Sequence, residues 1–174
     1  MIDSPRRSYE DSCGELLARG LIEDLPPLPP QRPLHDDEAL GISFFRTLLA
    51  DEDLSNMTIP RTFFGRSEIR SVSFRNTDLS ESTLCWNDFV EVDFTACTLG
   101  RSDMRAAMFK TALFTNADLC SADLRRSTFD GCDFSGADLR GAKLTREQGA
   151  KLRLSQGQAH SILWQDDGDE PGGG

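Results

Sequence analysis

The chain has 174 residues with 29 Asp or Glu against 19 Lys or Arg, which gives a formal net charge of −10. This acidic balance excludes a general electrostatic grip on nucleic acid, which requires a basic surface, but leaves open basic partners or imitation of DNA. A hydrophobic fraction of 38% is low for a large ordinary core, yet eleven Phe are too many for a disordered chain.

Residues 1–33 form a proline-rich N-terminal arm that we expect to be largely flexible, because they hold six of the eight prolines. The segment 25–33 is expected to adopt an extended polyproline II conformation. Residues 15–22 are compatible with a short helix, for which Ser12 and Glu15 have the spacing of a capping box. Residues 27–32 also match the docking pattern P-x-x-P-x-R, although a stiff linker explains the prolines without a partner.

Residues 34–51 predict an N-terminal helical cap. Asp36 or Asp37 is suited to cap a helix that runs to Ala50, and the apolar residues between them fall at helical spacing. Such a helix would cover the end of the domain that follows, together with the nearby side chain of Phe63.

Residues 52–146 repeat with a period of five, as nineteen consecutive pentapeptides without insertion. The central residue of each pentapeptide is large and apolar, the residue two positions earlier is mostly small, and Asp lies between them in nine of the nineteen repeats. Neither a helix nor a strand keeps this pattern on one face, since their periods are 3.6 and 2. The central residues are Leu54, Ile59, Phe64, Ile69, Phe74, Leu79, Leu84, Phe89, Phe94, Leu99, Met104, Phe109, Phe114, Leu119, Leu124, Phe129, Phe134, Leu139 and Leu144.

A coil that turns a corner every five residues does keep the pattern on one face. Four pentapeptides then form a square coil of twenty residues, with the central and small residues inside, and the repeats give fewer than five coils. Residues twenty apart in the sequence should therefore stack. The clearest such columns are Phe74, Phe94, Phe114 and Phe134, and Phe89, Phe109 and Phe129 above Ile69.

Three repeats read Ala-Asp-Leu, at residues 117–119, 122–124 and 137–139, and so the pattern resembles the A-[DN]-L-x-x motif of the pentapeptide-repeat family. The resemblance covers about 55% of the chain. It implies an all-β repeat solenoid, here a right-handed quadrilateral β-helix of about 19 pentapeptides with short helical caps. It does not imply one function.

Residues 147–164 predict a C-terminal helical cap. Thr145-x-x-Gln148 and Ser155-x-x-Gln158 repeat a capping-box spacing ten residues apart, which indicates two short helices with Trp164 as an apolar anchor. Residues 165–174 are acidic and rich in glycine, and we expect them to be disordered.

No catalytic constellation is evident, so we expect no enzyme, no cofactor and no metal site. His35 and His160 lie in the flanks and complete no Ser/His/Asp or Cys/His set. The recurring Asp residues are interpreted as solvated, turn-supporting positions. The five Cys form no C-x-x-C pair and are expected to be reduced thiols. Without a membrane-spanning stretch or a secretory leader, a cytoplasmic protein with no membrane partner is expected.

The resemblance suggests one functional alternative, because its quinolone-resistance group consists of acidic DNA mimics that bind type II topoisomerases such as gyrase. Mimicry requires negative charge along the rod, but residues 52–146 hold fourteen acidic and twelve basic residues, a net charge of −2. Several arginines are predicted to form a basic stripe, unless each pairs with a neighbouring Asp. They are Arg66, Arg105, Arg125, Arg126 and Arg146.

The sequence favours the other alternative, a non-enzymatic scaffold for protein–protein interaction. Its partner is a protein of unknown identity, direct nucleic-acid binding is not expected, and a homodimer is left open. Outward positions of the coils should be polar, yet four are apolar and fall on adjoining sides, which predicts a contact surface. These residues are Trp86, Val90, Met108 and Leu113. An N-terminal arm that folds back over them would explain them equally well.

Overall fold

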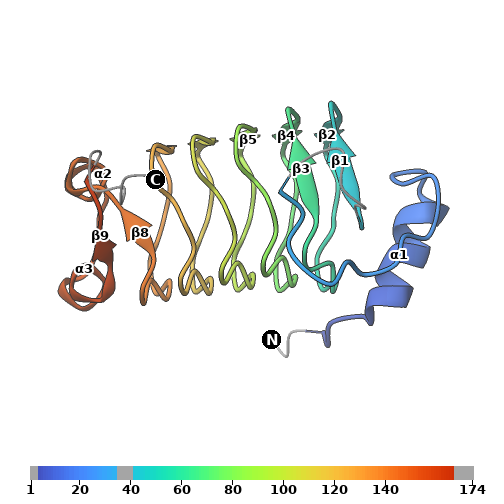
Figure 1. The fold of residues 1–174 in the computed structure, drawn as a ribbon, viewed down its shortest axis with the longest axis horizontal. Coiled ribbons are helices and arrows are strands. Elements are labelled where there is room, and N and C mark those ends of the chain that lie inside the picture. Colours follow the sequence, from blue (N-terminus) through green and yellow to red (C-terminus); the bar gives the residue numbers. More distant parts are fainter. Residues whose placement is uncertain (1–3, 35–40, 167–174) are drawn as a thin grey trace, which may run out of the picture.

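The computed structural model describes residues 4–34 and 41–166, and it confirms a right-handed quadrilateral β-helix (Figure 1). The β-helix has about six turns, so the prediction of fewer than five coils was too low. Every strand pairing is parallel and joins residues twenty apart, as in Leu48 with Glu68 and Asp88 with Met108. One coil therefore consists of four five-residue sides, as the period predicts. We number the sides one to four, with Phe64, Ile69, Phe74 and Leu79 at their respective centres.

Two of the four sides contain regular strands. Side two holds the five-stranded sheet, whose strands are β2 (Leu48–Ala50), β4 (Glu68–Arg70), β5 (Asp88–Val90), β6 (Met108–Lys110) and β7 (Thr128–Asp130). Side one holds β1 (Ser43–Phe45) paired with β3 (Phe63–Gly65), and later β8 (Lys143–Leu144) paired with β9 (Leu163–Trp164). Isolated parallel bridges join the remaining coils, again at twenty-residue intervals.

The corners of the coil depend on left-handed backbone. From Arg46 to Gly141, every fifth residue has a positive φ, including seventeen residues that are not glycine and the glycines at 131, 136 and 141. The Asp of a repeat supports the corner, because its Oδ1 accepts a hydrogen bond from the backbone N–H two residues later. This confirms the turn-supporting role predicted for Asp. The residues that do so are Asp53, Asp78, Asp93, Asp103, Asp118, Asp123, Asp133 and Asp138.

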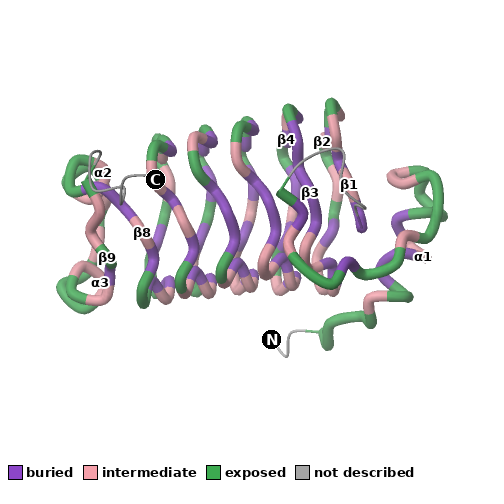
Figure 2. Tube along the Cα trace, viewed as in Figure 1, coloured by how far each residue is buried: buried purple, intermediate pink, exposed green. Residues whose placement is uncertain are grey.

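Two phenylalanine columns fill the core, as predicted, and buried residues recur in every coil (Figure 2). In one column, the Phe114 ring stacks on Phe94 and Phe134, with centroid distances of 5.1 and 4.7 Å. In the other, Phe109 stacks on Phe89 and Phe129 at 4.8 and 5.2 Å. Rings of the two columns meet edge to face, which is a favourable aromatic geometry.

The helix predicted to run from Asp36 or Asp37 to Ala50 is wrong, because residues 43–45 and 48–50 are the strands β1 and β2. Phe44 and Leu49 take the central positions of additional repeats, and Phe44 stacks on Phe64 with ring centroids 5.2 Å apart. Parallel pairing with the next coil buries these side chains and overrides the helical spacing. Residues 35–40 of the predicted cap lie outside the described residues.

The N-terminal cap is instead helix α1 (Tyr9–Ala18), so the helix predicted at 15–22 is also misplaced. Ser8 is its N-cap, and Gly20 ends it with a φ of +69°. Ser12, predicted as the cap, lies inside the helix and accepts a hydrogen bond from the backbone N–H of Thr58 in the first complete coil. Cys13 and Leu16 are buried against that coil, which closes the N-terminal end of the core.

The described part of the arm, residues 4–34, is docked on the solenoid rather than flexible. Arg6 donates to the carbonyl of Asn76, and Arg61 donates to the carbonyl of Pro29. Arg32, the cation of the P-x-x-P-x-R pattern, donates to the carbonyl of Arg101. A Cβ added to Gly41 would lie 2.6 Å from Cδ of Pro29, so the close approach of the arm requires glycine there. The arm therefore borders both edges of side four.

The C-terminal end has the two expected helices, α2 (Arg146–Lys151) and α3 (Gln156–Ser161), and both capping boxes are present. Each capping glutamine also uses its amide to cover the last coils. Nε2 of Gln148 donates to the carbonyls of Leu124 and Ser127, and Nε2 of Gln158 donates to the corresponding carbonyls two sides later. These bonds satisfy carbonyls that the end of a β-helix would otherwise expose.

Candidate interaction surface

The four outward apolar residues predicted as a contact surface lie at three different places on the coil. Val90 and Met108 lie together in a shallow hollow over side two, next to Leu48, whose side chain is also exposed. Trp86 lies at the corner between sides one and two, and Leu113 lies on side three. Neither lines the hollow over side two, so the predicted patch divides into separate places on the rod.

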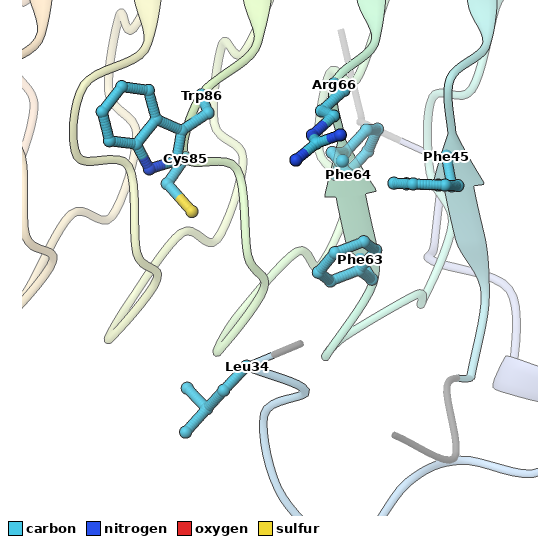
Figure 3. Close-up of a pocket in the computed structure, with 8 residues that line it drawn as sticks. Leu34, Phe45, Phe63, Phe64, Arg66, Cys85 and Trp86 are labelled. Atoms are coloured by element: carbon cyan, nitrogen blue, oxygen red, sulfur yellow. The ribbon is translucent and has the colours of Figure 1, made fainter. Parts of the chain in front are cut away.

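Trp86 is the most exposed of the four, at 72%, and it forms one wall of an aromatic groove on side one (Figure 3). The groove has a volume of about 550 Å³. Small residues make the hollow, because Gly65 and Cys85 take outward positions of side one where the adjacent coils carry Phe45 and Arg105. The residues that line it are Leu34, Phe45, Phe63, Phe64, Gly65, Arg66, Cys85 and Trp86.

The opposite wall is aromatic and depends on glycine. A Cβ added to Gly65 would lie 2.5 Å from the ring of Phe63 and 2.8 Å from the ring of Phe45, so both rings approach the backbone closely there. The centroids of the Phe45 and Phe63 rings lie 6.4 Å apart. Phe63 was expected under an N-terminal helix, but its neighbour at this position is the strand residue Phe45. The sequence did not predict this wall, although Phe63 at an outward position two residues before Gly65 was visible in the repeat.

The arm supplies the rim of the groove and leaves Trp86 uncovered. Thr83 donates a hydrogen bond of 2.5 Å to the carbonyl of Pro33, which holds the end of the arm on side one. The next residue, Leu34, lies at the groove with 54% of its surface exposed. Residues 4–34 thus border the groove on one side without shielding the indole, so the alternative that this part of the arm covers Trp86 is wrong.

The predicted basic stripe meets the groove at Trp86. Arg66, Trp86, Ala106 and Arg126 follow one another at the same corner of successive coils, and Arg146 begins α2 at the next coil. A second, smaller hollow of about 120 Å³ lies on the other side of the indole. Its lining consists of Trp86, Arg105, Ala106, Arg125 and Arg126. The indole therefore has an aromatic hollow on one side and a guanidinium-rich hollow on the other.

Part of the basic stripe is neutralised by ion pairs within the rod. Arg105 and Arg125 each bind the Asp two residues earlier through two hydrogen bonds of 2.8–2.9 Å. Burial alone would raise the pKa of Asp123, but its hydrogen bonds from Arg125 hold that pKa below the ordinary value. Arg146 lies 3.7 Å from Asp166. Ion pairing with Asp residues was the predicted alternative to a free basic stripe. That pairing is present for Arg105, Arg125 and Arg146.

Asp118, Cys120 and Asp138 on side four are residue types that ligate metals, and their polar atoms lie within 4.8 Å of one another. Asp118 already accepts a hydrogen bond from the backbone N–H of Cys120, and Asp138 binds Arg140 through several hydrogen bonds. Burial and both carboxylates raise the pKa of Cys120 to about 11, which opposes the thiolate that a metal would need. We assign this group to the turn structure.

The comparison with family models identifies the repeats. A model described as pentapeptide repeats matches residues 88–126 and 109–146, with eight copies. Together with the square coil and its twenty-residue register, this match identifies residues 88–146 as pentapeptide repeats. A search of curated proteins found no significant match. Among the described residues, no helix has the length and apolarity needed to cross a membrane.

Solved structures of pentapeptide-repeat proteins are similar to this chain. HetL, involved in heterocyst differentiation regulation in Nostoc sp. strain PCC 7120, has 19% identity and a TM-score of 0.55 over 57% of this chain and 48% of its own. Rfr23 from Cyanothece 51142 has 13% identity, a TM-score of 0.48 and coverages of 73% and 90%. QnrB1, a plasmid-mediated fluoroquinolone resistance protein, has 20% identity, a TM-score of 0.34 and coverages of 68% and 74%. The match spans about half of HetL and supports the fold alone.

Proposed function

We propose that the protein is a non-enzymatic repeat scaffold that binds a protein partner through the aromatic groove beside Trp86. The observation that carries the proposal is the exposed indole, which forms a wall shared by two hollows. Exposed tryptophans with a concave apolar neighbourhood are frequent anchors of protein interfaces, because burying their large surface yields much of the binding energy. The cytoplasmic location and the lack of a nucleic-acid partner stay predictions.

The way in which the groove is built supports a binding role. Its walls come from three segments: the end of the arm at Leu34, strands β1 and β3 with Phe45 and Phe63, and the Trp86 corner. Apart from Phe64, the lining side chains are not at central positions, and Trp86 and Leu34 are mostly exposed, so the core of the β-helix does not require those two. The arm and the coils hold the walls in place before a partner arrives, which reduces the entropy lost on binding.

Site-specific photocrosslinking tests this proposal. A benzophenone amino acid at position 86 should give a discrete crosslinked product in cells that express the protein, because the indole position faces the partner. An excess of the unlabelled native protein should compete the product away, and an excess of Trp86→Ala protein should not. A product of twice the mass of the chain would identify a second copy as the partner.

Position 113 is the matched control, since Leu113 is also an exposed outward residue but lies on side three. The proposal is contradicted if positions 86 and 113 give the same products, or if Trp86→Ala competes as well as the native protein. Circular dichroism of each variant establishes that the β-helix is intact in both.

The alternative function is a DNA mimic that binds gyrase. Mimicry requires a continuous acidic surface, whereas acids such as Asp103 and Asp123 are paired with arginines of the same side. No feature of the described residues specifically favours this alternative. It predicts inhibition or protection of gyrase in a supercoiling assay at micromolar concentration, and the absence of any effect would argue against it.

A further inference from the structure

The corner between sides one and two differs from the other corners in how its charges are arranged. At the corner between sides four and one, an acid separates two arginines, because Glu81 lies between Arg61 and Arg101 and accepts hydrogen bonds from both. At the groove corner, Arg46 and Arg66 follow each other directly, about one coil spacing of ~4.8 Å apart. An acid therefore pairs with both arginines at the first corner, whereas no acid lies between the two arginines at the second.

No acidic side chain of residues 4–34 or 41–166 compensates these two arginines. The Arg46 guanidinium lies over the ring of Phe45, 5.1 Å from its centroid, and forms no ion pair in that part of the chain. Arg66 lines the groove and likewise has no carboxylate partner there. Both side chains are exposed. Two cations with no carboxylate partner among the described residues thus border an aromatic groove on a protein whose net charge is −10.

We infer that the partner of the groove is an acidic peptide segment that carries an apolar side chain. The apolar side chain would lie between Trp86 and Phe63, and its neighbouring carboxylates would pair with Arg46 and Arg66. Charge complementarity supports this occupant, because the corner supplies cations where the rest of the molecule supplies mainly anions. The inference rests on the proposed function and adds the chemistry of the partner.

A peptide explains the groove better than a nucleic acid does. The total charge of −10 repels a polyanion at long range, whereas a short segment with a few carboxylates experiences mainly the local cations. The aromatic walls at Phe45 and Phe63 also provide a place for one apolar side chain, which fits a peptide with a hydrophobic residue between acids.

Fluorescence anisotropy with labelled peptides tests the inference on the full-length protein. The probe is a fluorescein-labelled pentapeptide with a central leucine, one glutamate on each side of it and a serine at each end. One control peptide has lysines instead of the glutamates, and a second has serine instead of the leucine. The first probe should bind, its affinity should fall as salt is raised, and both control peptides should bind at least about tenfold more weakly.

The double variant Arg46→Glu/Arg66→Glu should weaken binding of the acidic probe by at least about tenfold. Glutamate already occupies equivalent left-handed corners at Glu81 and Glu91, so this variant should fold. The matched control is Lys110→Glu/Arg153→Glu, which changes the net charge equally at exposed positions remote from the groove and should leave the affinity unchanged.

Several results would overturn the inference. These are equal weakening by both double variants, equal affinity for the lysine probe, or equal affinity for a single-stranded DNA oligonucleotide of the same charge. Failure of the acidic probe to bind at all would also overturn it. None of these results alters the photocrosslinking outcome at position 86, so a wrong partner chemistry and a wrong binding site are distinguishable.

Discussion

Replacing Phe114 with Ala removes one of the rings that join the two phenylalanine columns. Phe114 has no exposed surface and stacks between Phe94 and Phe134, with interplanar angles of 10° and 11°. Its ring also meets Phe109 edge to face at 5.4 Å. The parallel coils on either side are hydrogen-bonded to each other and limit how far the site can collapse, so the substitution leaves a cavity.

The magnitude follows from two contributions. Truncating a buried Phe to Ala destabilises a protein by about 3–5 kcal/mol, through lost transfer free energy and the cavity that remains. Each aromatic pair contributes about 0.5–1.5 kcal/mol beyond its buried area, and Phe114 belongs to several pairs. Because these contributions overlap, we expect a loss near the upper end of the first range, about 5 kcal/mol.

Chemical unfolding in guanidinium chloride, followed by far-ultraviolet circular dichroism, measures this loss. Leu113→Ala is the matched control, since Leu113 is the preceding residue on the same side but points outward, and we expect its cost to be about 1 kcal/mol or less. The reasoning is refuted if Phe114→Ala costs no more than Leu113→Ala. That result would mean that the inward register is wrong.

Three further substitutions test the caps, the arm and the turns. Gln148→Ala should lower the unfolding free energy by about 1–3 kcal/mol, because two carbonyls of the last coils lose their donor; unchanged stability would contradict the capping role. Gly41→Ala should displace Pro29 and speed proteolysis of the arm without unfolding the coils, as limited trypsin digestion would show. Hydrogen bonds from Arg140 lower the pKa of Asp138 from 3.8 to about 2, so this carboxylate stabilises the fold above pH 4 and ceases to do so as the pH falls towards 2. Asp138→Asn should therefore reduce the loss of thermal stability between those pH values, and an unaltered pH profile would disprove the assignment.

The inward half of the structure could be predicted because the sequence repeats in residue identity at twenty-residue intervals. Columns such as Phe74, Phe94 and Phe114 require no knowledge of the outer surface, since the period alone determines which residues stack. The capping boxes at Thr145 and Ser155 were also predictable from the sequence, because their hydrogen bonds are local. Local geometry and a strict period are both properties that a single sequence displays.

The N-terminal boundary was not predictable in the same way. Phe44 and Leu49 are five residues apart and continue the repeat, but the same segment also has helical spacing of its apolar residues. Pairing with the next coil decides between these alternatives, and that pairing is a long-range interaction. A local criterion therefore favours the helix, and the packed structure favours the strands.

Because residues 34–51 were predicted to be helical, the groove could not be predicted either. With residues 34–51 assigned to a helix, Phe45 had no position in the coil, and its column with Gly65 and Cys85 was not visible. Extending the register by two repeats places the three residues on one side at successive coils, where a hollow beside Phe63 follows from the small size of two of them. The arm residue that completes the rim could not be predicted, because its docking depends on side-chain-to-backbone hydrogen bonds between distant segments.

The chemistry of the corner at Trp86 fits binding better than folding. The φ of Trp86, +60°, is positive like that of every corner of the rod, and smaller residues such as Ala96 and Ala106 occupy equivalent corners, so the fold does not require tryptophan there. The indole is also mostly exposed, so it contributes little burial in return. The same reasoning applies to the adjacent Arg66, whose charge is not compensated by an acid of the described residues. Two residues in every five build the β-helix, and deviations from ordinary chemistry among the other three indicate where a partner binds.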